Sequence, residues 1–237
     1  MDKVALVTGA DRGLGLALVN SLLDQGWIVF AGKHLEWPEL DELKESYPTN
    51  LNVIPLDVSS DESVIESAKL VQSSVSHIDL LIANAAINRS HEVHSIRQNP
   101  CMEQMALEFN VNAIGALRLV NSFLPLLDAG QMKRLCFVSS EAGSIGASKR
   151  TGWFGYCMSK AALNMAVKNL SNDLSSQGFS FRLYHPGWLK TYMSGTKNEH
   201  ASMEPEEGAE IALEYFLSDS GEVALSLHDW EGNDMPW

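Results

Sequence analysis

The sequence lacks the features that would place it in a membrane or in an oxidising compartment. It contains no run of about 18 apolar residues, and the apolar run Val4–Val7 near its start is too short for a signal peptide or a membrane span. Only three cysteines are present, an odd number without a C-x-x-C spacing, so we expect neither a disulfide framework nor a metal site. These absences predict a reduced, cytoplasmic protein without a membrane partner.

Positive charge is also scarce. The 237 residues carry 17 Lys and Arg against 30 Asp and Glu, which gives a net charge of −13. The imbalance is greatest from Asn198 onward, where eleven acids occur without any Lys or Arg. Such a surface repels phosphate backbones, so we expect no nucleic-acid partner and interpret this segment as a solvated acidic face.

Short apolar runs alternate with stretches of helical period along almost the whole chain. Several of these runs are apolar nearly throughout, as parallel strands covered by helices on both faces should be. The alternation predicts an α/β fold with one doubly wound parallel sheet of about seven strands, flanked by helices and spanning residues 1–237 as a single domain. The predicted strands are Val4–Thr8, Trp27–Ala31, Leu51–Leu56, Ile78–Ala83, Leu135–Ser139, Phe179–Tyr184 and Val223–Leu227. The predicted helices are Leu14–Gln25, Glu39–Ser46, Asp61–Ser74, Met102–Leu127, Tyr156–Ser176 and Pro205–Leu217.

Two connections, Asn88–Pro100 and Thr191–Glu204, are long for such a fold. Loops of that length in a small domain are usually functional or mobile. Both follow predicted strands, and ligands of open parallel sheets bind beyond the carboxyl ends of the strands. We therefore expect a ligand site where these two loops emerge.

A glycine-rich turn joins the first predicted strand to the first predicted helix. Glycines let the backbone turn tightly and approach a pyrophosphate, and the following helix start offers unpaired N–H groups at the positive end of its dipole. The position between a strand and a helix is the context that a dinucleotide-binding turn requires. The turn reads Thr8-Gly9-Ala10-Asp11-Arg12-Gly13-Leu14-Gly15, of which Gly9, Asp11, Arg12, Gly13, Leu14 and Gly15 are the predicted cofactor-binding residues.

This T-G-x-x-x-G-x-G spacing resembles that of the short-chain dehydrogenase/reductase family, and further motifs follow in the family's order. The resemblance covers essentially the whole chain and is strongest to the carbonyl reductases of the sniffer and C-signal type. It implies a Rossmann-like fold, a nicotinamide cofactor and a homodimer or homotetramer that pairs through the long predicted helices. The matching positions are Asp57-Val58, Asn84 within Ala83–Ala86, Asn112, the pair Ser139-Ser140, the Y-x-x-x-K motif of Tyr156 and Lys160, and Pro186, Gly187 and Thr191.

Tyr156 and Lys160 are four residues apart on a predicted helix and so share one face. A free tyrosine has a pKa of about 10, and an ammonium about 4 Å away supplies roughly 4 kcal/mol, enough to lower that pKa by 2–3 units. We therefore predict Tyr156 as the general acid of a reduction, with Lys160 lowering its pKa. By resemblance, Lys160 also holds the nicotinamide ribose.

Two more catalytic residues are assigned on the resemblance. Ser140, the second serine of its pair, would donate to the carbonyl oxygen of the substrate as hydride arrives, and Ser139 is the alternative. Asn112 would hold a water that links Lys160 to solvent, and its alternative role is that of a capping or buried amide. The segment from Ser140 to Tyr156 spans 16 positions, longer than is usual in the family, which predicts a larger loop beside the pocket.

The end of the second predicted strand decides between NADP and NAD. NAD enzymes place a carboxylate there for the ribose 2′-hydroxyl, whereas NADP enzymes place cationic groups for the 2′-phosphate. This chain has Lys33 and His34 there, no acid before Glu36, and a further cation in Arg12. These residues predict that NADP(H) is preferred, and NAD(H) remains the alternative.

The predicted substrate is a small carbonyl compound: a ketone, an aldehyde or a quinone. Its pocket would be apolar, and the candidates that border it are Trp153, Phe154, Trp188 and Met193. Two other hypotheses stay open. One is a non-catalytic protein of the same fold that senses NADPH or signals, which is favoured because Ala83 and Ala86 depart from the family's pattern. The other is an NAD-dependent alcohol dehydrogenase.

Overall fold

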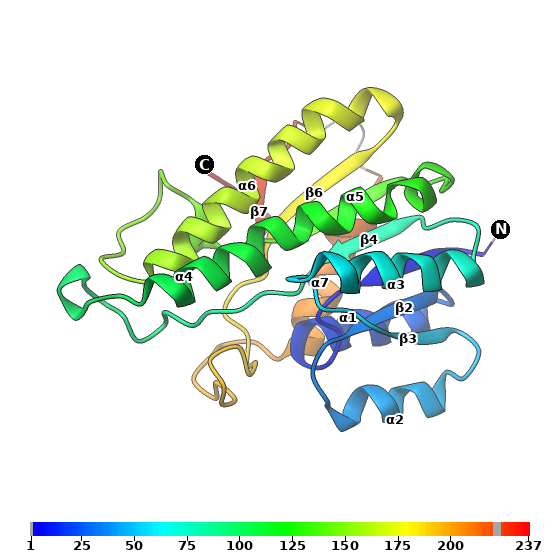
Figure 1. Ribbon diagram of the computed structural model, residues 1–237, viewed down its shortest axis with the longest axis horizontal. Helices are drawn as coiled ribbons and strands as arrows, with labels where there is room; N and C mark the ends of the chain where they lie inside the picture. Colours follow the sequence, from blue (N-terminus) through cyan, green and yellow to red (C-terminus); the bar gives the residue numbers. More distant parts are fainter. Residues whose placement is uncertain (1, 220–223) are drawn as a thin grey trace.

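Eight strands form one sheet in the order β3-β2-β1-β4-β5-β6-β7-β8, and every neighbouring pair is parallel except the last (Figure 1). The computed structural model describes residues 2–219 and 224–237. It confirms the predicted α/β fold with a doubly wound sheet. The strands are β1 (Val4–Val7), β2 (Ile28–Lys33), β3 (Leu51–Pro55), β4 (Leu80–Ala83), β5 (Arg134–Val138), β6 (Ser180–His185), β7 (Leu227–Asp229) and β8 (Asp234–Met235).

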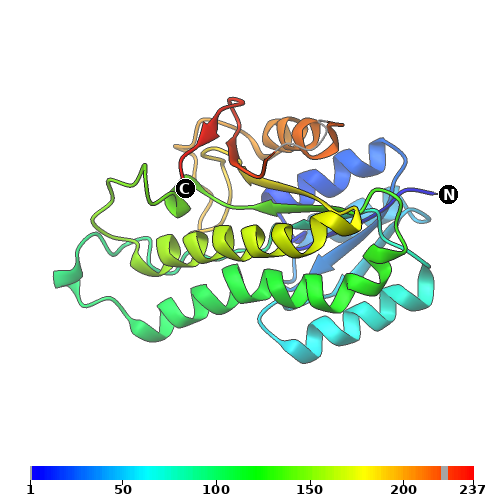
Figure 2. The ribbon, with the colours of Figure 1, turned by 90° about the horizontal axis from the view of Figure 1, so that it is seen from above.

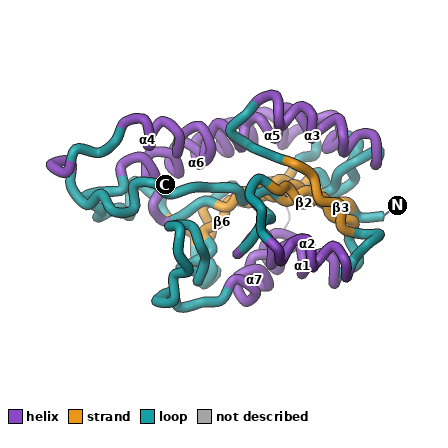
Figure 3. The backbone as a smooth tube through the Cα atoms, turned by 60° about the horizontal axis from the view of Figure 1, so that its bottom comes forward, coloured by secondary structure: helices purple, strands orange, loops and turns teal. Residues whose placement is uncertain are grey.

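Helices cover both faces of this sheet, which is why its central strands are apolar throughout (Figures 2 and 3). One face packs against α1, α2 and α7, and the other against α3, α5 and α6, while α4 packs alongside α6 (Figure 3). The helices are α1 (Gly13–Asp24), α2 (Pro38–Ser46), α3 (Asp61–Ser74), α4 (Met102–Phe109), α5 (Gly115–Asp128), α6 (Phe154–Leu174) and α7 (Pro205–Leu217). None of the helices within the described residues combines the length and the apolar character that a membrane span requires.

The carboxyl end of the chain differs from the prediction. The seventh strand was expected at Val223–Leu227, but Val223 lies outside the described residues and β7 runs from Leu227 to Asp229. The Asp229 carboxylate accepts the backbone N–H groups of Glu231 and Asn233, at 3.0 and 2.8 Å. This turn brings the tail back as the antiparallel strand β8, so the sheet has eight strands instead of about seven. The residues of β7 and β8 are largely polar, so no apolar run in the sequence marks these two strands.

The helix expected at Met102–Leu127 is also interrupted. It consists of α4 and α5 joined by a π-helical turn at Asn110–Ile114. Single π-turns inside helices are commonly found at functional sites. Here the turn presents Asn112 to the carboxyl end of the sheet.

The strand order places a ligand site at one edge of the sheet. The chain winds from β1 through β2 to β3, then crosses back to β4 on the other side of β1. Ligands of doubly wound sheets bind at this switch point, beyond the carboxyl ends of the two strands. The glycine-rich turn follows β1 and Asn84 follows β4, so both lie at that point.

Candidate active site

The glycine-rich turn has the backbone conformation that only glycine adopts easily. Gly9 and Gly13 have φ angles of +62° and +58°, in the left-handed region. A Cβ on Gly15 would lie 2.1 Å from the Gly9 carbonyl oxygen, so this third glycine lets α1 pack against the turn. Among residues 2–219 and 224–237 no side chain caps the start of α1, which leaves the first N–H groups of the helix, including that of Leu14, for an anionic ligand.

Asp11, a predicted cofactor-binding residue, uses its carboxylate to hold the backbone of the site. Its buried carboxylate accepts the backbone N–H groups of His34 and Leu35, at 2.7 and 2.9 Å. Both donors follow β2, so Asp11 ties the glycine-rich turn to the neighbouring strand end. The carboxylate is therefore hydrogen-bonded to the backbone of the protein and stabilises the shape of the site.

Arg12 lies between two aromatic rings that come from distant parts of the chain. Its guanidinium carbon is 4.6 Å from the centroid of Trp37 and 5.4 Å from that of Tyr192, and Nη2 donates to the Tyr192 carbonyl at 3.2 Å. The two rings are themselves 5.1 Å apart. This cluster joins the glycine-rich turn to the loop after β6, and no motif in the sequence indicated Trp37 as part of the site.

The predicted cation Lys33 is already paired with acids. Its ammonium lies 2.8 Å from Glu36 and 3.2 Å from Asp41, and these contacts raise its pKa. His34 is exposed and offers its backbone N–H to Asp11. Of the two permanent cations among the predicted phosphate ligands, Lys33 is therefore paired with carboxylates, whereas Arg12 has no carboxylate partner within the described residues.

Asp57 and Asn84 occupy the two sides of the switch point. Partial burial raises the pKa of Asp57, but hydrogen bonds from Ser59 to its carboxylate outweigh this and hold the pKa below its ordinary value. The carboxylate is therefore ionised and able to accept, next to the buried Val58. Asn84 donates through Nδ2 to the carbonyls of Thr8 and Gly9, at 2.9 and 3.2 Å, and so fixes the glycine-rich turn against β4.

The two serines at the end of β5 have different surroundings. The Ser139 hydroxyl donates to Asn164 at 2.6 Å, inside the protein. The Ser140 hydroxyl accepts the Ala142 N–H at 3.1 Å and lies beside the Tyr156 phenol. This geometry favours Ser140 over Ser139 as the residue that faces the substrate.

The predicted lowering of the Tyr156 pKa by Lys160 is not what the structure gives. Burial raises the pKa of Tyr156 to about 12, although the Ser140 hydroxyl acts against the rise. The Lys160 ammonium donates to the Val138 carbonyl at 2.9 Å and lies 5.7 Å from the centroid of the tyrosine ring. Burial lowers the pKa of Lys160 itself to about 7, which weakens its effect as a cation.

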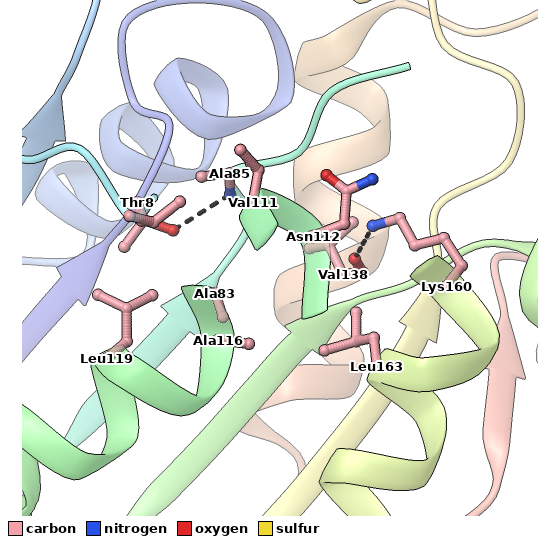
Figure 4. Close-up of a pocket in the computed structure, with 11 residues that line it drawn as sticks. Thr8, Ala83, Ala85, Val111, Asn112, Ala116, Leu119, Val138, Lys160 and Leu163 are labelled. Carbon is pink, nitrogen blue, oxygen red and sulfur yellow. Dashed lines mark hydrogen bonds between the residues drawn. The ribbon is translucent and has the colours of Figure 1, made fainter. Parts of the chain in front are cut away.

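Asn112 likewise has its amide committed to protein partners. Its Oδ1 accepts the Ile87 N–H at 2.8 Å, and its Nδ2 donates to the Ile87 carbonyl and the Ser159 hydroxyl, both at 2.9 Å. The side chain therefore joins the π-turn, the segment after β4 and α6, as the alternative of a buried amide predicts, and a water held by Asn112 stays a prediction. A small cavity nearby is lined by both Asn112 and Lys160, with Thr8 on its far side (Figure 4).

The predicted substrate residues are only partly brought together. The Trp153 ring meets Tyr156 edge-on, with centroids 6.2 Å apart, and Phe154 begins α6 beside it. Trp188 and Met193 are exposed on the loop after β6, and within the described residues neither makes a ring contact with Tyr156. On the same loop, Gly187 has a φ of +80°, Pro186 precedes it, and Thr191 lies against Gly13: a Cβ built on that glycine would be 3.2 Å from Thr191 Cγ2.

Sequence reasoning missed the ion pair of Glu141 and Arg150 beside Tyr156. Glu141 directly follows Ser140, and Arg150 belongs to the lengthened segment before Tyr156. Their positions next to predicted catalytic residues could have indicated that they belong to the site. The Trp237 carbonyl accepts the Gly146 N–H at 2.7 Å, which places the end of the chain over that lengthened segment.

Comparison with known proteins adds independent findings. The profile of the family described as short chain dehydrogenase matches residues 3–202. The protein named C-signal of Myxococcus xanthus is 34% identical over 160 residues, which cover 68% of this chain and 93% of that protein. The crystal structure of NADPH-bound carbonyl reductase from chicken fatty liver has a TM-score of 0.86 and 31% identity, covering 100% of this chain and 99% of that one. Carbonyl reductase Sniffer of D. melanogaster has a TM-score of 0.86 and 25% identity, covering 100% of both chains.

Proposed function

Because this chain belongs to the short-chain dehydrogenase family, we propose that it is an NADP(H)-dependent reductase that converts a ketone, aldehyde or quinone to the corresponding alcohol. The observation that carries the proposal is the pair of buried hydroxyls, Ser140 and Tyr156, side by side at the carboxyl end of β5. Lys160 lies one helical turn beyond Tyr156. Two adjacent hydroxyl donors are suited to bind one carbonyl oxygen.

The residues at the switch point fit a dinucleotide, because the three glycines leave room for close approach and no described side chain caps the start of α1. When bound, NADPH supplies the hydride. The N–H groups from Gly13 to Gly15 would hold its pyrophosphate, Asp57 would accept from the adenine amine, and Arg12 would bind the 2′-phosphate. The similar chicken carbonyl reductase, whose crystal structure is NADPH-bound, supports NADP over the alternative, NAD.

Tyr156 is the proton donor in this proposal. Its raised pKa keeps the phenol protonated at neutral pH, as a general acid must be before the reaction. The phenol gives its proton to the carbonyl oxygen as hydride reaches the carbon, while the Ser140 hydroxyl donates a hydrogen bond to the same oxygen. Lys160 is suited to return a proton to Tyr156, because a group with a pKa of about 7 exchanges protons readily near neutrality.

Self-association through α4, α5 and α6 completes the proposal. Large apolar side chains are exposed on these helices, although isolated exposed apolar residues are common on proteins. A homodimer or homotetramer would cover them, and light scattering coupled to size exclusion measures the mass directly. They include Met102, Leu107, Phe109, Leu117, Met158 and Met165.

The test follows NADPH and NADH oxidation by the purified protein with a quinone, an α-dicarbonyl, an aromatic aldehyde and a cyclic ketone. We expect turnover with NADPH, abolished in Tyr156→Phe while that variant still binds NADPH. Retained turnover in Tyr156→Phe would overturn the catalytic assignment. Tight NADPH binding without turnover of any compound would favour the sensing alternative, and binding of neither cofactor would refute the proposal.

A further inference from the structure

The loop after β4, residues 88–100, and the segment before α6, residues 140–153, pack together beside Tyr156. We call the surface that they form the wall, although about sixty residues separate its two parts in sequence. The Trp153 N–H donates to the Val93 carbonyl at 2.9 Å, and its indole Nε1 donates to the His91 carbonyl at 2.7 Å. The Thr151 hydroxyl donates to the His94 carbonyl at 3.0 Å. The segment before α6 is therefore fixed on the loop after β4.

Trp153 is held in this wall at the cost of backbone strain. Its φ of +58° lies in the left-handed region, which an aromatic residue rarely adopts. Such a conformation persists only where surrounding contacts determine it, and it occurs most often at functional sites. The two hydrogen bonds to the loop after β4 supply those contacts, and they set the indole edge-on to the Tyr156 ring.

Arg150 is positioned by the same indole. Its guanidinium carbon lies 4.3 Å from the centroid of the Trp153 ring, so a single aromatic ring separates this cation from Tyr156. The guanidinium also donates to the Glu141 carboxylate through Nη2. Within the described part of the chain this is its one hydrogen bond, so four of its five N–H groups face no protein acceptor. The side chain is 35% exposed and open to a ligand.

The charge of the wall differs from that of the protein. The segments 88–100 and 140–153 carry four Lys and Arg against two Glu, while the chain as a whole has a net charge of −13. Positive charge that is local in an acidic protein attracts an anion to that place. The basic residues are Arg89, Arg97, Lys149 and Arg150, and the acids are Glu92 and Glu141.

We propose that Arg150, seated on Trp153, binds a carboxylate of the substrate, so that the protein acts on carbonyl compounds that carry an ionised carboxylate beyond one ring's width from the reacting carbonyl. This inference rests on the proposed reductase function and names its substrate class. A guanidinium presents parallel N–H groups that match the two oxygens of a carboxylate, and the flat indole beneath keeps the fork in place. Glu141 occupies one of these N–H groups and competes with the incoming carboxylate.

The test compares two aldehydes that differ only in charge, 4-carboxybenzaldehyde and its neutral methyl ester. We expect the wild-type protein to show the higher kcat/KM for the carboxylate with NADPH. Arg150→Gln should lower the ratio of the two kcat/KM values by about tenfold or more, because charge-assisted hydrogen bonds are lost. Glu141→Gln should raise the ratio by removing the competitor. Equal kcat/KM for both aldehydes in the wild type would overturn the inference and leave the reductase function standing.

Lys149→Gln is the matched control, since it removes the same charge from the neighbouring position without removing a ring contact. We expect it to change the ratio by less than about twofold, as an exposed and screened charge should. If the ratio of the two kcat/KM values fell equally in Lys149→Gln and Arg150→Gln, the preference would come from the general positive potential of the region and not from a carboxylate subsite. An equal loss with both aldehydes in Arg150→Gln would show that the pair with Glu141 serves only to hold the loop.

A binding measurement separates this inference from the reductase function. Benzoate and benzamide are titrated into protein saturated with NADP⁺, and the quenching of tryptophan fluorescence is followed. We expect benzoate to bind more tightly than benzamide, with that difference lost in Arg150→Gln but kept in Lys149→Gln. If the difference survives in Arg150→Gln, or if benzoate binds no better than benzamide to the wild type, the carboxylate subsite is refuted even without any turnover.

Discussion

The Lys160 ammonium lies 5.7 Å from the centroid of the Tyr156 ring, one turn along α6, and its hydrogen bond goes to the Val138 carbonyl. Lys160 is 2% exposed, and within the described residues no carboxylate pairs with it. Burying a cation without a counter-ion costs free energy, and here the cost appears as a pKa lowered to about 7. The protein thus keeps a destabilising group at the centre of its proposed site.

Replacing Lys160 by methionine should therefore stabilise the fold while abolishing turnover. The pKa of Lys160 falls from 10.5 to about 7 on folding, so between these values the unfolded chain binds more protons and stability rises with pH. The full cost is present below about pH 7 and has gone above about pH 10.5. We expect Lys160→Met to raise the free energy of unfolding by on the order of 3 kcal/mol near pH 7, less than the whole shift because Val138 loses its donor.

Urea unfolding of both proteins at about pH 6, 8 and 10 measures this effect. The gain should be largest at the lowest pH and smallest at the highest, where most of the burial cost has gone. A variant that is less stable than the wild type at every pH would show that Lys160 carries no burial cost. Loss of turnover without loss of stability also separates its chemical role from a structural one.

Ser140→Ala and Ser139→Ala should differ in their kinetics. We expect Ser140→Ala to lower kcat/KM by about 100- to 1000-fold, as the loss of one donor to a developing oxyanion typically does, and also to lower stability because the Ala142 N–H loses its acceptor. Ser139→Ala removes the partner of the buried Asn164 and should cost about 1–3 kcal/mol of stability with little change in kcat. Steady-state kinetics and thermal unfolding of both variants decide the matter, and a large kinetic defect in Ser139→Ala would reverse the assignment.

The fold and the position of the main side chains could be predicted because they depend on local pattern. Apolar runs without polar interruption mark the strands of a covered parallel sheet, and the glycine-rich turn and the Tyr156–Lys160 spacing lie within single elements. Their order along the chain then places them at the same edge of the sheet. Periodicity and spacing are therefore sufficient to predict the fold and the edge of the sheet at which these side chains lie.

The partners of the polar groups could not be predicted, since they come from other parts of the chain. Asp11 accepts from residues that follow β2, and Lys160 donates to a carbonyl of β5. The pKa of Tyr156 depends on its burial by several elements, which outweighs the nearby cation that the helical spacing suggested. The edge strand β8 was not predicted, because its pairing depends on a turn made by Asp229.

Asp11→Ala should weaken the fold and the cofactor site together. The carboxylate is buried and accepts two backbone N–H groups, so its loss leaves both donors without this partner, at a cost of about 1–3 kcal/mol. Asp11→Asn is the control, because its amide oxygen can still accept and should keep most of the stability. Urea unfolding and NADPH titration measure both effects. A variant that loses NADPH affinity without any loss of stability would restore Asp11 as a direct contact.

Arg12 and Lys33 should contribute unequally to the preference for NADP over NAD. Lys33 is already neutralised by Glu36 and Asp41, so Lys33→Ala should change the affinity for NADPH by less than about threefold. In the part of the chain that the structure describes, the partners of Arg12 are aromatic rings and a carbonyl, so its charge is available to a 2′-phosphate. Arg12→Ala should weaken NADPH binding by about tenfold or more and NADH binding far less.

Fluorescence titration of NADPH and NADH with the wild type and both variants gives the four ratios needed. Arg12 also bridges Trp37 and Tyr192, so its removal could loosen the site for either cofactor alike. Equal weakening of NADPH and NADH in Arg12→Ala would therefore identify a purely structural bridge. A selective loss of NADPH in Lys33→Ala would instead mean that the phosphate displaces Glu36 and Asp41 from the lysine, since only a free ammonium can distinguish the two cofactors by charge.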